Sequence, residues 1–402
     1  MTLDTITSAA WTDDDPRYRS SVIRDLLVHA RRPGVISLAG GLPAPELLAT
    51  EVLGNAMADV MATGGRDALQ YGLTEGETPM VDAILRDFPG MGPANVLVTA
   101  GSQQALALAA AVLAGPQVAG APAPVALIEQ PGYIGALQAL RAAGLEPIGV
   151  PVDGEGLVVE ELERILGELS TRGVTPRFCY VNPTFQNPTG ASLSPERTER
   201  LLKIAEANDL LLIADDPYKE LFLDGDRPDG IAPAPGVLSL GSLSKTLSPA
   251  LRVGWAVGPA PLIARMTLAK QPADLQTSTL TQAVAATALG DERWWQAHLA
   301  GLRTRYAERR QALLDAVTHH LPEATITPQR GGFFLWLDLS AYGVTDAKAA
   351  LERALDAGVA FVPGSASSIS AEPAATIRLS YSSGDPDTFD EAIRRLAAAL
   401  SS

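Results

Sequence analysis

Short apolar runs alternate with helical stretches rich in alanine and leucine through the middle of the chain, from about residue 96 to residue 257. Runs rich in β-branched residues are typical of buried strands, and intervening helices are the connections that parallel strands need. The pattern therefore predicts an α/β fold with a mostly parallel sheet covered by helices. The seven predicted strands are residues 96–100, 124–129, 146–150, 178–182, 210–215, 237–241 and 253–257.

The pattern changes after residue 258, where long helical periodicity continues to about residue 321. Two apolar segments follow, GGFFLWLDL (331–339) and AATIRLSYS (374–382), with a helical stretch between them. This order predicts a second, smaller α+β domain, and a chain of 402 residues is long enough for two domains. We expect residues 49–285 to form the large domain, 286–402 the small domain, and 1–48 a segment that joins the small one.

Charge and composition exclude several classes of function. The net charge of −15 argues against nucleic acid as a partner, because phosphate backbones are bound by clustered Lys and Arg. No apolar run reaches the roughly 18 residues that span a bilayer, and the N-terminus lacks the order of a signal peptide, so we expect a cytoplasmic protein with no membrane partner. The single cysteine, Cys179, lies in the apolar run FCYVN, which predicts a buried structural thiol. The histidines lack metal-ligand spacing, and we expect no metal.

One lysine stands out in the stretch SLGSLSKTLSPALRVGW (239–255). A lysine at the end of an apolar strand is usually a solvated side chain, and that is the alternative for Lys245. Its neighbours Ser242, Ser244 and Arg252 supply hydroxyls and a guanidinium, which suit a phosphate monoester. A lysine beside a phosphate site suggests a Schiff base with pyridoxal phosphate, whose aldehyde condenses with an amine.

Such a cofactor needs further parts, and candidates follow other predicted strands. Asp215 ends a strand and can keep the pyridine nitrogen protonated, while Tyr218 and Asn187 can hold the ring's 3-oxygen. Ser102 and Gln103 open a helix, where N–H groups favour a phosphate. Tyr133 can cover the ring. An Asp turn, a rigid Pro/Asn loop, a simple N-cap or ordinary packing explains each signal alone, but their joint appearance in this order favours the cofactor.

With these motifs the chain resembles the fold type I, class I/II pyridoxal-phosphate aminotransferases. It is most similar to the 2-aminoadipate and kynurenine branch, which is related to the effector domains of MocR-type regulators. The resemblance runs from about Ser20 to Ser383. Its most specific segments are ISLAGGLPAPEL, LQYG, AGSQQAL, FQNPTG, DDPY, GSLSKTLSPALRVGW and RLSYS.

The resemblance assigns roles position by position. Lys245 would form the Schiff base and move the proton between the substrate Cα and C4′ of the cofactor, with Asp215 and Tyr218 as its catalytic partners. Tyr71 matches a tyrosine that reaches the phosphate of the neighbouring subunit, which implies a homodimer with shared active sites. The implied cofactor-binding residues are Ser102, Gln103, Tyr133, Asn187, Asp215, Tyr218, Ser242, Lys245 and Arg252, together with Tyr71.

Four positions match substrate contacts of the family. Arg378 would clamp the α-carboxylate, a task that suits a planar guanidinium, although an edge-strand arginine in solvent is the alternative. Gly40 would lie against the substrate backbone, and Asn187 would touch the substrate as well as the cofactor. Arg24 matches a position near the substrate side chain; a surface helix arginine explains it as well.

Departures from the family bear on specificity. Aromatic residues usually follow the VPG motif, whereas this chain has Ser367 and Ser368, and Leu38 and Leu243 stand where phenylalanine is common. We therefore expect a roomier or more polar side-chain pocket.

The resemblance implies an aminotransferase that moves the amino group of an L-amino acid to a 2-oxo acid, 2-oxoglutarate or pyruvate, in ping-pong order. The alternatives on the same scaffold are β-lyases, decarboxylases, cyclising enzymes and oxidases, because fold does not fix the reaction. A regulator that senses the cofactor is a more remote alternative. Fewer than about twenty residues precede the resemblance, too few for a DNA-binding domain.

Overall fold

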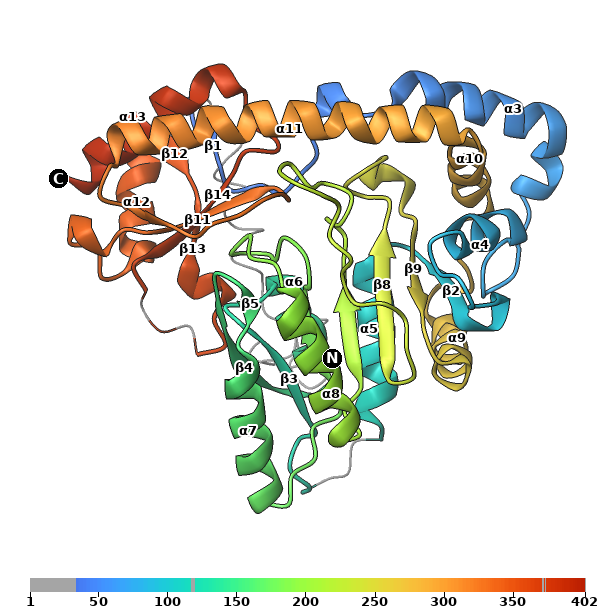
Figure 1. Ribbon diagram of the computed structural model, residues 1–402. Helices are drawn as coiled ribbons and strands as arrows, with labels where there is room; N and C mark the ends of the chain where they lie inside the picture. Colours follow the sequence, from blue (N-terminus) through green and yellow to red (C-terminus); the bar gives the residue numbers. More distant parts are fainter. Residues whose placement is uncertain (1–33, 117–119, 371, 373, 402) are drawn as a thin grey trace, which may run out of the picture.

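The structure is a computed structural model that describes residues 34–116, 120–370, 372 and 374–401. Within these residues no helix has both the length and the apolar character that crossing a membrane requires. Two sheets organise the fold, and one long helix runs across the top of both (Figure 1).

The larger sheet has eight strands in the order β2-β9-β8-β7-β6-β3-β4-β5. The five strands from β8 to β4 are parallel, whereas β9 is antiparallel to both β2 and β8, and β5 is antiparallel to β4. In chain order the strands are β2 (Val96–Thr99), β3 (Val125–Gln130), β4 (Glu146–Asp153), β5 (Gly156–Leu157), β6 (Cys179–Val181), β7 (Leu212–Asp215), β8 (Val237–Ser242) and β9 (Gly254–Val257).

All seven predicted strands are present, and the predicted α/β class is confirmed. The predicted strand number was one too low, because β5 contains only two residues and no apolar run marks it. It forms the return arm of a hairpin from β4, in which Val152 pairs with Leu157 and Asp153 with Gly156.

Helices cover both faces of the large sheet. Along β3, Val125 and Leu127 pack under α7 and α8, whereas Ala126 and Ile128 pack against the cluster of α5, α6 and α9. This alternation is why the strand is apolar at nearly every position. A third cluster joins α3, α4 and α10 over β2 and β9. These helices are α3 (Thr50–Ala68), α4 (Thr78–Leu85), α5 (Ser102–Ala114), α6 (Ile134–Ala142), α7 (Val159–Thr171), α8 (Pro195–Ala207), α9 (Ala260–Asp274) and α10 (Thr279–Gly290).

The smaller sheet is antiparallel, with the order β10-β11-β14-β13. A separate pair joins β1 to β12 in parallel, so residues 36–37 lie beside a much later part of the chain. The elements are β1 (Ile36–Ser37), α11 (Glu292–His320), β10 (Thr325–Ile326), β11 (Phe334–Asp338), α12 (Ala347–Asp356), β12 (Val359–Ala360), β13 (Val362–Pro363), β14 (Thr376–Ser380) and α13 (Phe389–Leu400). Short 3-10 helices occupy Pro45–Leu47, Pro93–Asn95, Pro249–Leu251, Ser340–Tyr342, Gly364–Ser367 and Pro386–Thr388.

The parallel strands β3, β6, β7 and β8 point the same way, so their carboxyl ends meet at one edge of the sheet. In open α/β sheets this edge is where ligands bind. Most of the polar residues singled out in the sequence follow these strand ends.

Candidate active site

Lys245 lies in the turn that follows β8, and its ammonium group points across the site. Nζ donates a hydrogen bond to the carbonyl oxygen of Gly41 at 2.9 Å. It also lies 5.9 Å from the ring centroids of Tyr218 and Phe333. Burial, together with the positive charge of Arg378, lowers the pKa of Lys245 to about 8. About a tenth of the side chain is therefore a neutral amine at pH 7, which is the nucleophilic form and a larger fraction than an ordinary lysine has.

Asp215 is the last residue of β7, and its carboxylate is buried beside this lysine. Oδ2 accepts a hydrogen bond from the Tyr180 phenol at 2.8 Å, whereas Oδ1 has no hydrogen-bond partner among the described residues. Burial raises the pKa of Asp215 to about 7, although the Tyr180 phenol and the nearby Ser102 hydroxyl oppose the rise. A buried oxygen without a donor is costly, and a protonated pyridine nitrogen is a donor that would satisfy it. The site thus fits the pyridine ring of the cofactor.

Three residues that the sequence analysis did not select hold Asp215 in place. Asn182 donates from Nδ2 to the backbone oxygen of Asp215 at 2.6 Å and to the Tyr180 oxygen at 3.3 Å. Its own N–H donates to Oε2 of Glu129 at 3.0 Å. Burial raises the pKa of Glu129 to about 8, so this side chain is mostly neutral at pH 7. Tyr180 and Asn182 alternate on one face of their strand, and this polar alternation in FCYVN is the signal that could have found them.

The start of α5 and Arg252 form a cradle that could hold a phosphate, called the phosphate cradle below. Gly101 has φ +100°, and a Cβ there would lie 2.9 Å from Nη2 of Arg252, so glycine is required. Ser102 is the first residue of α5, whose N–H groups and dipole favour an anion. The Arg252 guanidinium donates to the backbone oxygen of Ala100, which holds it at this helix end. Ser242 lies next to this group, since it pairs with Gly254, which abuts the backbone of Gly101. Its hydroxyl is 2.8 Å from that of Ser244.

Tyr133 is hydrogen bonded to Gln103, the residue that follows Ser102 in α5. The Tyr133 phenol donates to Oε1 of Gln103 at 3.1 Å, and Nε2 of Gln103 donates to the backbone oxygen of Gly135 at 2.9 Å. Burial raises the pKa of Tyr133 to about 12, so the phenol stays neutral. These bonds fix the ring of Tyr133 at the start of α6.

Arg378 and Asn187 meet across the site, although 191 positions separate them in the chain. Nη1 of Arg378 donates to Oδ1 of Asn187 at 2.8 Å, and Nη2 donates to the backbone oxygen of Ala39 at 2.7 Å. The guanidinium carbon lies 4.2 Å from the ring centroid of Phe334, which fixes the plane of the group. Burial lowers the pKa of Arg378 to about 10, so the side chain remains charged at neutral pH.

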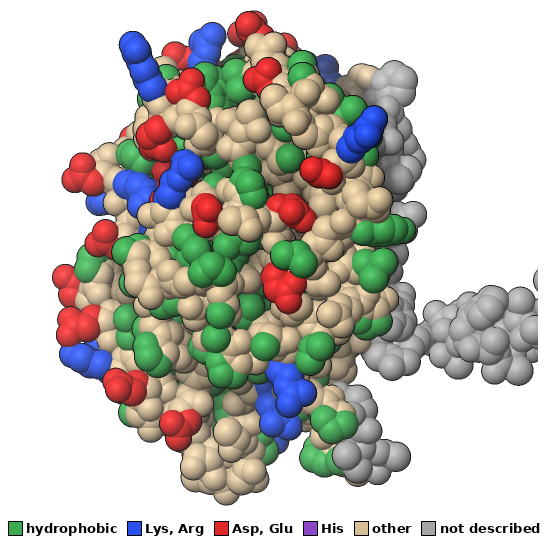
Figure 2. All heavy atoms as spheres, turned by 90° about the vertical axis from the view of Figure 1, so that its right-hand side faces the viewer, with side chains coloured by type: hydrophobic (Ala, Val, Ile, Leu, Met, Phe, Trp, Pro, Cys, Tyr) green, Lys and Arg blue, Asp and Glu red, His purple; other side chains and the backbone are tan. Residues whose placement is uncertain are grey.

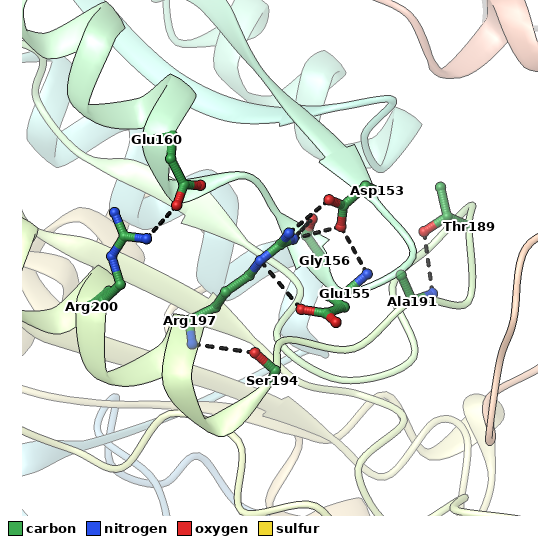
Figure 3. Close-up of polar contacts among 9 residues, drawn as sticks. All are labelled: Asp153, Glu155, Gly156, Glu160, Thr189, Ala191, Ser194, Arg197 and Arg200. Carbon is green, nitrogen blue, oxygen red and sulfur yellow. Dashed lines mark hydrogen bonds and ion pairs between the residues drawn. The ribbon is translucent and has the colours of Figure 1, made fainter.

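The loop that carries Asn187 is braced from outside the site (Figure 3). Arg197 of α8 donates to Oδ1 and Oδ2 of Asp153 at 2.5 and 2.7 Å and to the backbone oxygen of Gly156 at 3.1 Å. Ser194 caps the same helix by accepting from the Arg197 N–H at 3.3 Å. The β4–β5 hairpin and α8 are thereby tied together at the end of this loop, which stabilises the position of Asn187.

Gly40 and Tyr218 lie at the same site. The Ser383 hydroxyl donates to the backbone oxygen of Gly40 at 3.4 Å, and the next residue, Gly41, accepts from Lys245. Tyr218 is buried, with its ring edge-on to Phe333 at a centroid distance of 5.4 Å.

Two predicted residues are not brought into this group. Tyr71 follows α3 and is 78% exposed, and its one hydrogen bond within residues 34–116 and the other described ranges runs from its backbone N–H to Oε1 of Gln70 at 2.9 Å. Arg24 lies outside the described residues.

The residues tied to specificity are also placed. Gln130 donates from Nε2 to the Ser368 hydroxyl at 2.6 Å, and Gly132 donates its N–H to the backbone oxygen of Ser367 at 2.9 Å. The Ser367 hydroxyl is buried without a hydrogen-bond partner among the described residues. Leu38 packs in the cluster that contains Tyr218, whereas Leu243 packs under α4 and α10.

Comparison with known proteins gives a consistent result. The family described as aminotransferase class I and II matches residues 44–396. A 2-aminoadipate transaminase from Thermus thermophilus is 39% identical over 391 residues, which cover 96% of this chain and 94% of that protein. The crystal structure of a Pyrococcus horikoshii kynurenine aminotransferase with PMP superimposes with a TM-score of 0.91 at 35% identity, covering 99% of this chain and 98% of that one. The T. thermophilus α-aminoadipate aminotransferase LysN, complexed with N-(5′-phosphopyridoxyl)-L-leucine, gives a TM-score of 0.87 at 36% identity and covers 98% of each chain.

Proposed function

The chain belongs to the class I and II aminotransferases and is an enzyme that depends on pyridoxal 5′-phosphate; from this premise we propose how its own residues bind the cofactor and transfer the amino group. The observation that carries the proposal is the buried Oδ1 of Asp215, which finds no donor in the part of the chain that the structure describes and lies in the same site as the amine of Lys245. A buried carboxylate oxygen without a donor is costly in a protein core, and a pyridinium nitrogen would supply the missing donor.

The cofactor supplies an aldehyde for the amino group and a ring that draws electrons from the substrate Cα. Asp215 holds the ring nitrogen in its protonated form, and Tyr180 and Asn182 hold the carboxylate. Tyr218 and Asn187 would donate toward the 3-oxygen of a bound cofactor, and Tyr133 would cover its ring. Gly101, Ser102, Gln103, Ser242 and Arg252 form the phosphate cradle.

Lys245 moves the proton. Its pKa of about 8 lets Nζ accept a proton from the substrate Cα and return it at the next step, because a group titrating near the working pH serves as both base and acid. The hydrogen bond to Gly41 holds Nζ on the side of the site formed by residues 38–44.

Arg378 binds the substrate α-carboxylate. Its plane is fixed by Phe334 and by two protein acceptors, so it can offer a rigid pair of donors. Both the amino acid and the 2-oxo acid carry this carboxylate, so one arginine serves both halves of a ping-pong reaction. We propose 2-oxoglutarate or pyruvate as acceptor.

The side-chain pocket is proposed to be roomy or polar. Beside the site, the buried Ser367 and the half-buried Ser368 stand in place of aromatic residues, and Gln130 is hydrogen bonded to Ser368. One relative is named a 2-aminoadipate transaminase, and this polar amino acid is the first donor to test. If phenylalanine and kynurenine outran every polar and aliphatic donor in a substrate panel, the proposed pocket would be wrong.

A homodimer with shared sites is proposed on exposed apolar side chains near Tyr71. Leu69, Leu73 and Leu275 are 64%, 62% and 55% exposed. They follow α3 and α9, on the face where Figure 2 shows hydrophobic side chains among charged ones. Mixing Lys245→Ala with Tyr71→Ala protein should restore roughly a quarter of the activity, since half of the dimers are mixed and each has one intact site. No recovery from mixed dimers would refute shared sites.

We also propose the division into residues 49–285 and 286–402, with 1–48 joining the second part. The largest apolar cluster of the small sheet includes Leu38, Ala39 and Ala44, and β1 pairs with β12, which supports this division. We propose the cytoplasm as the location, following the sequence.

A half-reaction screen tests the proposed function. Amino acids are added singly to the holoenzyme, and loss of the absorbance of the lysine-linked cofactor is followed. A transaminase recovers this absorbance on addition of 2-oxoglutarate or pyruvate and releases no ammonia. Ammonia release without an acceptor would instead favour a β-lyase.

A further inference from the structure

A buried lysine without a role in the site described above lies one layer behind the phosphate cradle. Lys270, near the end of α9, is 0% exposed. Nζ donates to Oε1 of Gln104 at 2.9 Å and to both carboxylate oxygens of Asp274 at 2.8 Å. A buried ammonium is costly unless it is fully paired, so this position is tightly specified.

Gln104 closes the group into a ring of three side chains. It lies in the first turn of α5, and Nε2 donates to Oδ2 of Asp274 at 2.6 Å. Its Oε1 also accepts the backbone N–H of Ala100 at 2.8 Å. The amide is therefore held at both ends, by Lys270 and Ala100 at the oxygen and by Asp274 at the nitrogen.

Ala100 connects this ring to the cradle. The Ala100 N–H is bound by Gln104, and the Ala100 carbonyl accepts the guanidinium of Arg252. Gly101 and Ser102 follow directly, and they form the helix start that offers N–H groups to an anion. The three side chains thus hold the Ala100 peptide in place, and this peptide positions both the Arg252 side chain and the start of α5.

The ring also reaches the loop of Tyr71. Asp274 ends α9, and the next residue, Leu275, has φ +65° and ψ −55° in a tight turn closed by the Gln276 N–H and the Asp274 oxygen at 2.8 Å. Non-glycine residues rarely adopt this conformation, so surrounding contacts must hold it. Oε1 of Gln276 accepts the N–H of Gly72, which follows Tyr71.

We propose that Lys270, Asp274 and Gln104 are positioning residues for the cofactor phosphate, an inference that rests on the proposed function. They do not touch the phosphate. They set the distance between the N–H groups of α5 and the guanidinium of Arg252, and binding of a dianion depends on that distance because charge-assisted bonds are sensitive to geometry. Replacement of a buried ion pair by apolar residues is often neutral for stability. We therefore expect removal of the cluster to weaken phosphate binding rather than to impair folding.

The test compares pyridoxal 5′-phosphate with pyridoxal, which lacks the phosphate. Both are titrated into cofactor-free wild-type protein, Lys270→Met, the double variant Lys270→Met/Asp274→Leu, and Lys203→Met, a control whose side chain is 70% exposed. We expect both cluster variants to raise the Kd for pyridoxal 5′-phosphate about tenfold or more, the size of one charge-assisted hydrogen bond. The Kd for pyridoxal should stay within about twofold, and the control should match wild type.

The outcomes separate positioning from general packing. A parallel rise in both Kd values, or no rise in either, overturns the inference. If Lys270→Met does not fold, the double variant gives the same comparison without an unpaired carboxylate, and its thermal unfolding is measured beside it. A wild-type protein that binds pyridoxal as tightly as pyridoxal 5′-phosphate would instead refute the proposed cradle itself.

Discussion

Replacement of Tyr180 by phenylalanine tests how the protein controls Asp215. The substitution removes one oxygen, which donates to Oδ2 of Asp215 at 2.8 Å and accepts from Asn182 at 3.3 Å. A hydrogen bond to a charged group contributes about 1.5–3 kcal/mol. Since one pKa unit corresponds to about 1.4 kcal/mol, the pKa of Asp215 should rise by roughly one to two units in Tyr180→Phe.

The rise has a defined sign in the pH profile. The Tyr180 phenol lowers the pKa of Asp215, so its loss favours the protonated carboxyl, which cannot pair with a pyridinium nitrogen. Because the pKa of Asp215 starts at about 7, the rate of the amino-donor half-reaction should fall about 5- to 50-fold at pH 7. Its acidic limb, where activity is lost as pH falls, should move to higher pH by the same amount, roughly one to two units.

Stopped-flow measurement of the half-reaction from pH 5.5 to pH 9 would provide the profile. Tyr342→Phe is the matched control, because its phenol also accepts a hydrogen bond, from the Glu323 N–H at 2.9 Å. Tyr342 lies in the 3-10 helix Ser340–Tyr342 that follows β11 of the smaller sheet. A Tyr180→Phe enzyme with an unchanged rate and an unmoved acidic limb would refute the proposed control of Asp215.

Three further substitutions test other parts of the site. Arg378→Lys should lower kcat/KM for the amino donor about 10- to 100-fold, because an ammonium cannot replace two fixed donors. Steady-state kinetics would contradict this if kcat/KM stayed at the wild-type value. Gly101→Ala should raise the Kd for the cofactor about tenfold, since alanine at φ +100° would crowd Arg252 at 2.9 Å; equilibrium titration with wild-type affinity would count against the cradle. Glu129→Gln should become more stable relative to wild type as pH rises from 4.5 toward 8. The pKa of Glu129 is raised in the folded state, so the wild-type protein loses stability as pH rises through this window, whereas glutamine does not titrate. Chemical unfolding that shows a constant difference in stability between the two proteins would contradict that pKa.

The sequence predicted the strands well where burial on both faces gave apolar runs, such as Val96–Val98 in β2 and Val125–Ile128 in β3. It did not predict β5, whose two residues carry no pattern. Cys179 was predicted to be buried, and its side chain is 0% exposed. The family and the cofactor predicted from the motifs are confirmed by the comparisons.

The contacts between segments that are distant in the chain could not be predicted from the sequence. The Arg378–Asn187 pair depends on how β14 of the small sheet faces the loop after β6, and no local pattern encodes that packing. Nothing in the sequence assigned Tyr180 a role in the site, because it lies in an apolar strand. Its polar end became meaningful only once β7 was placed beside β6, which brings Asp215 to the same face.

The central claim is that Lys245 carries the cofactor. The chain has five lysines, Lys203, Lys219, Lys245, Lys270 and Lys348, so the claim can be tested directly. Borohydride reduction of the holoenzyme, followed by proteolysis and mass spectrometry, locates the pyridoxyl group. We predict that it lies on the peptide that contains Lys245 and is absent from a Lys245→Ala protein. Its recovery on any of the other four lysines, or its persistence in Lys245→Ala, would contradict the account.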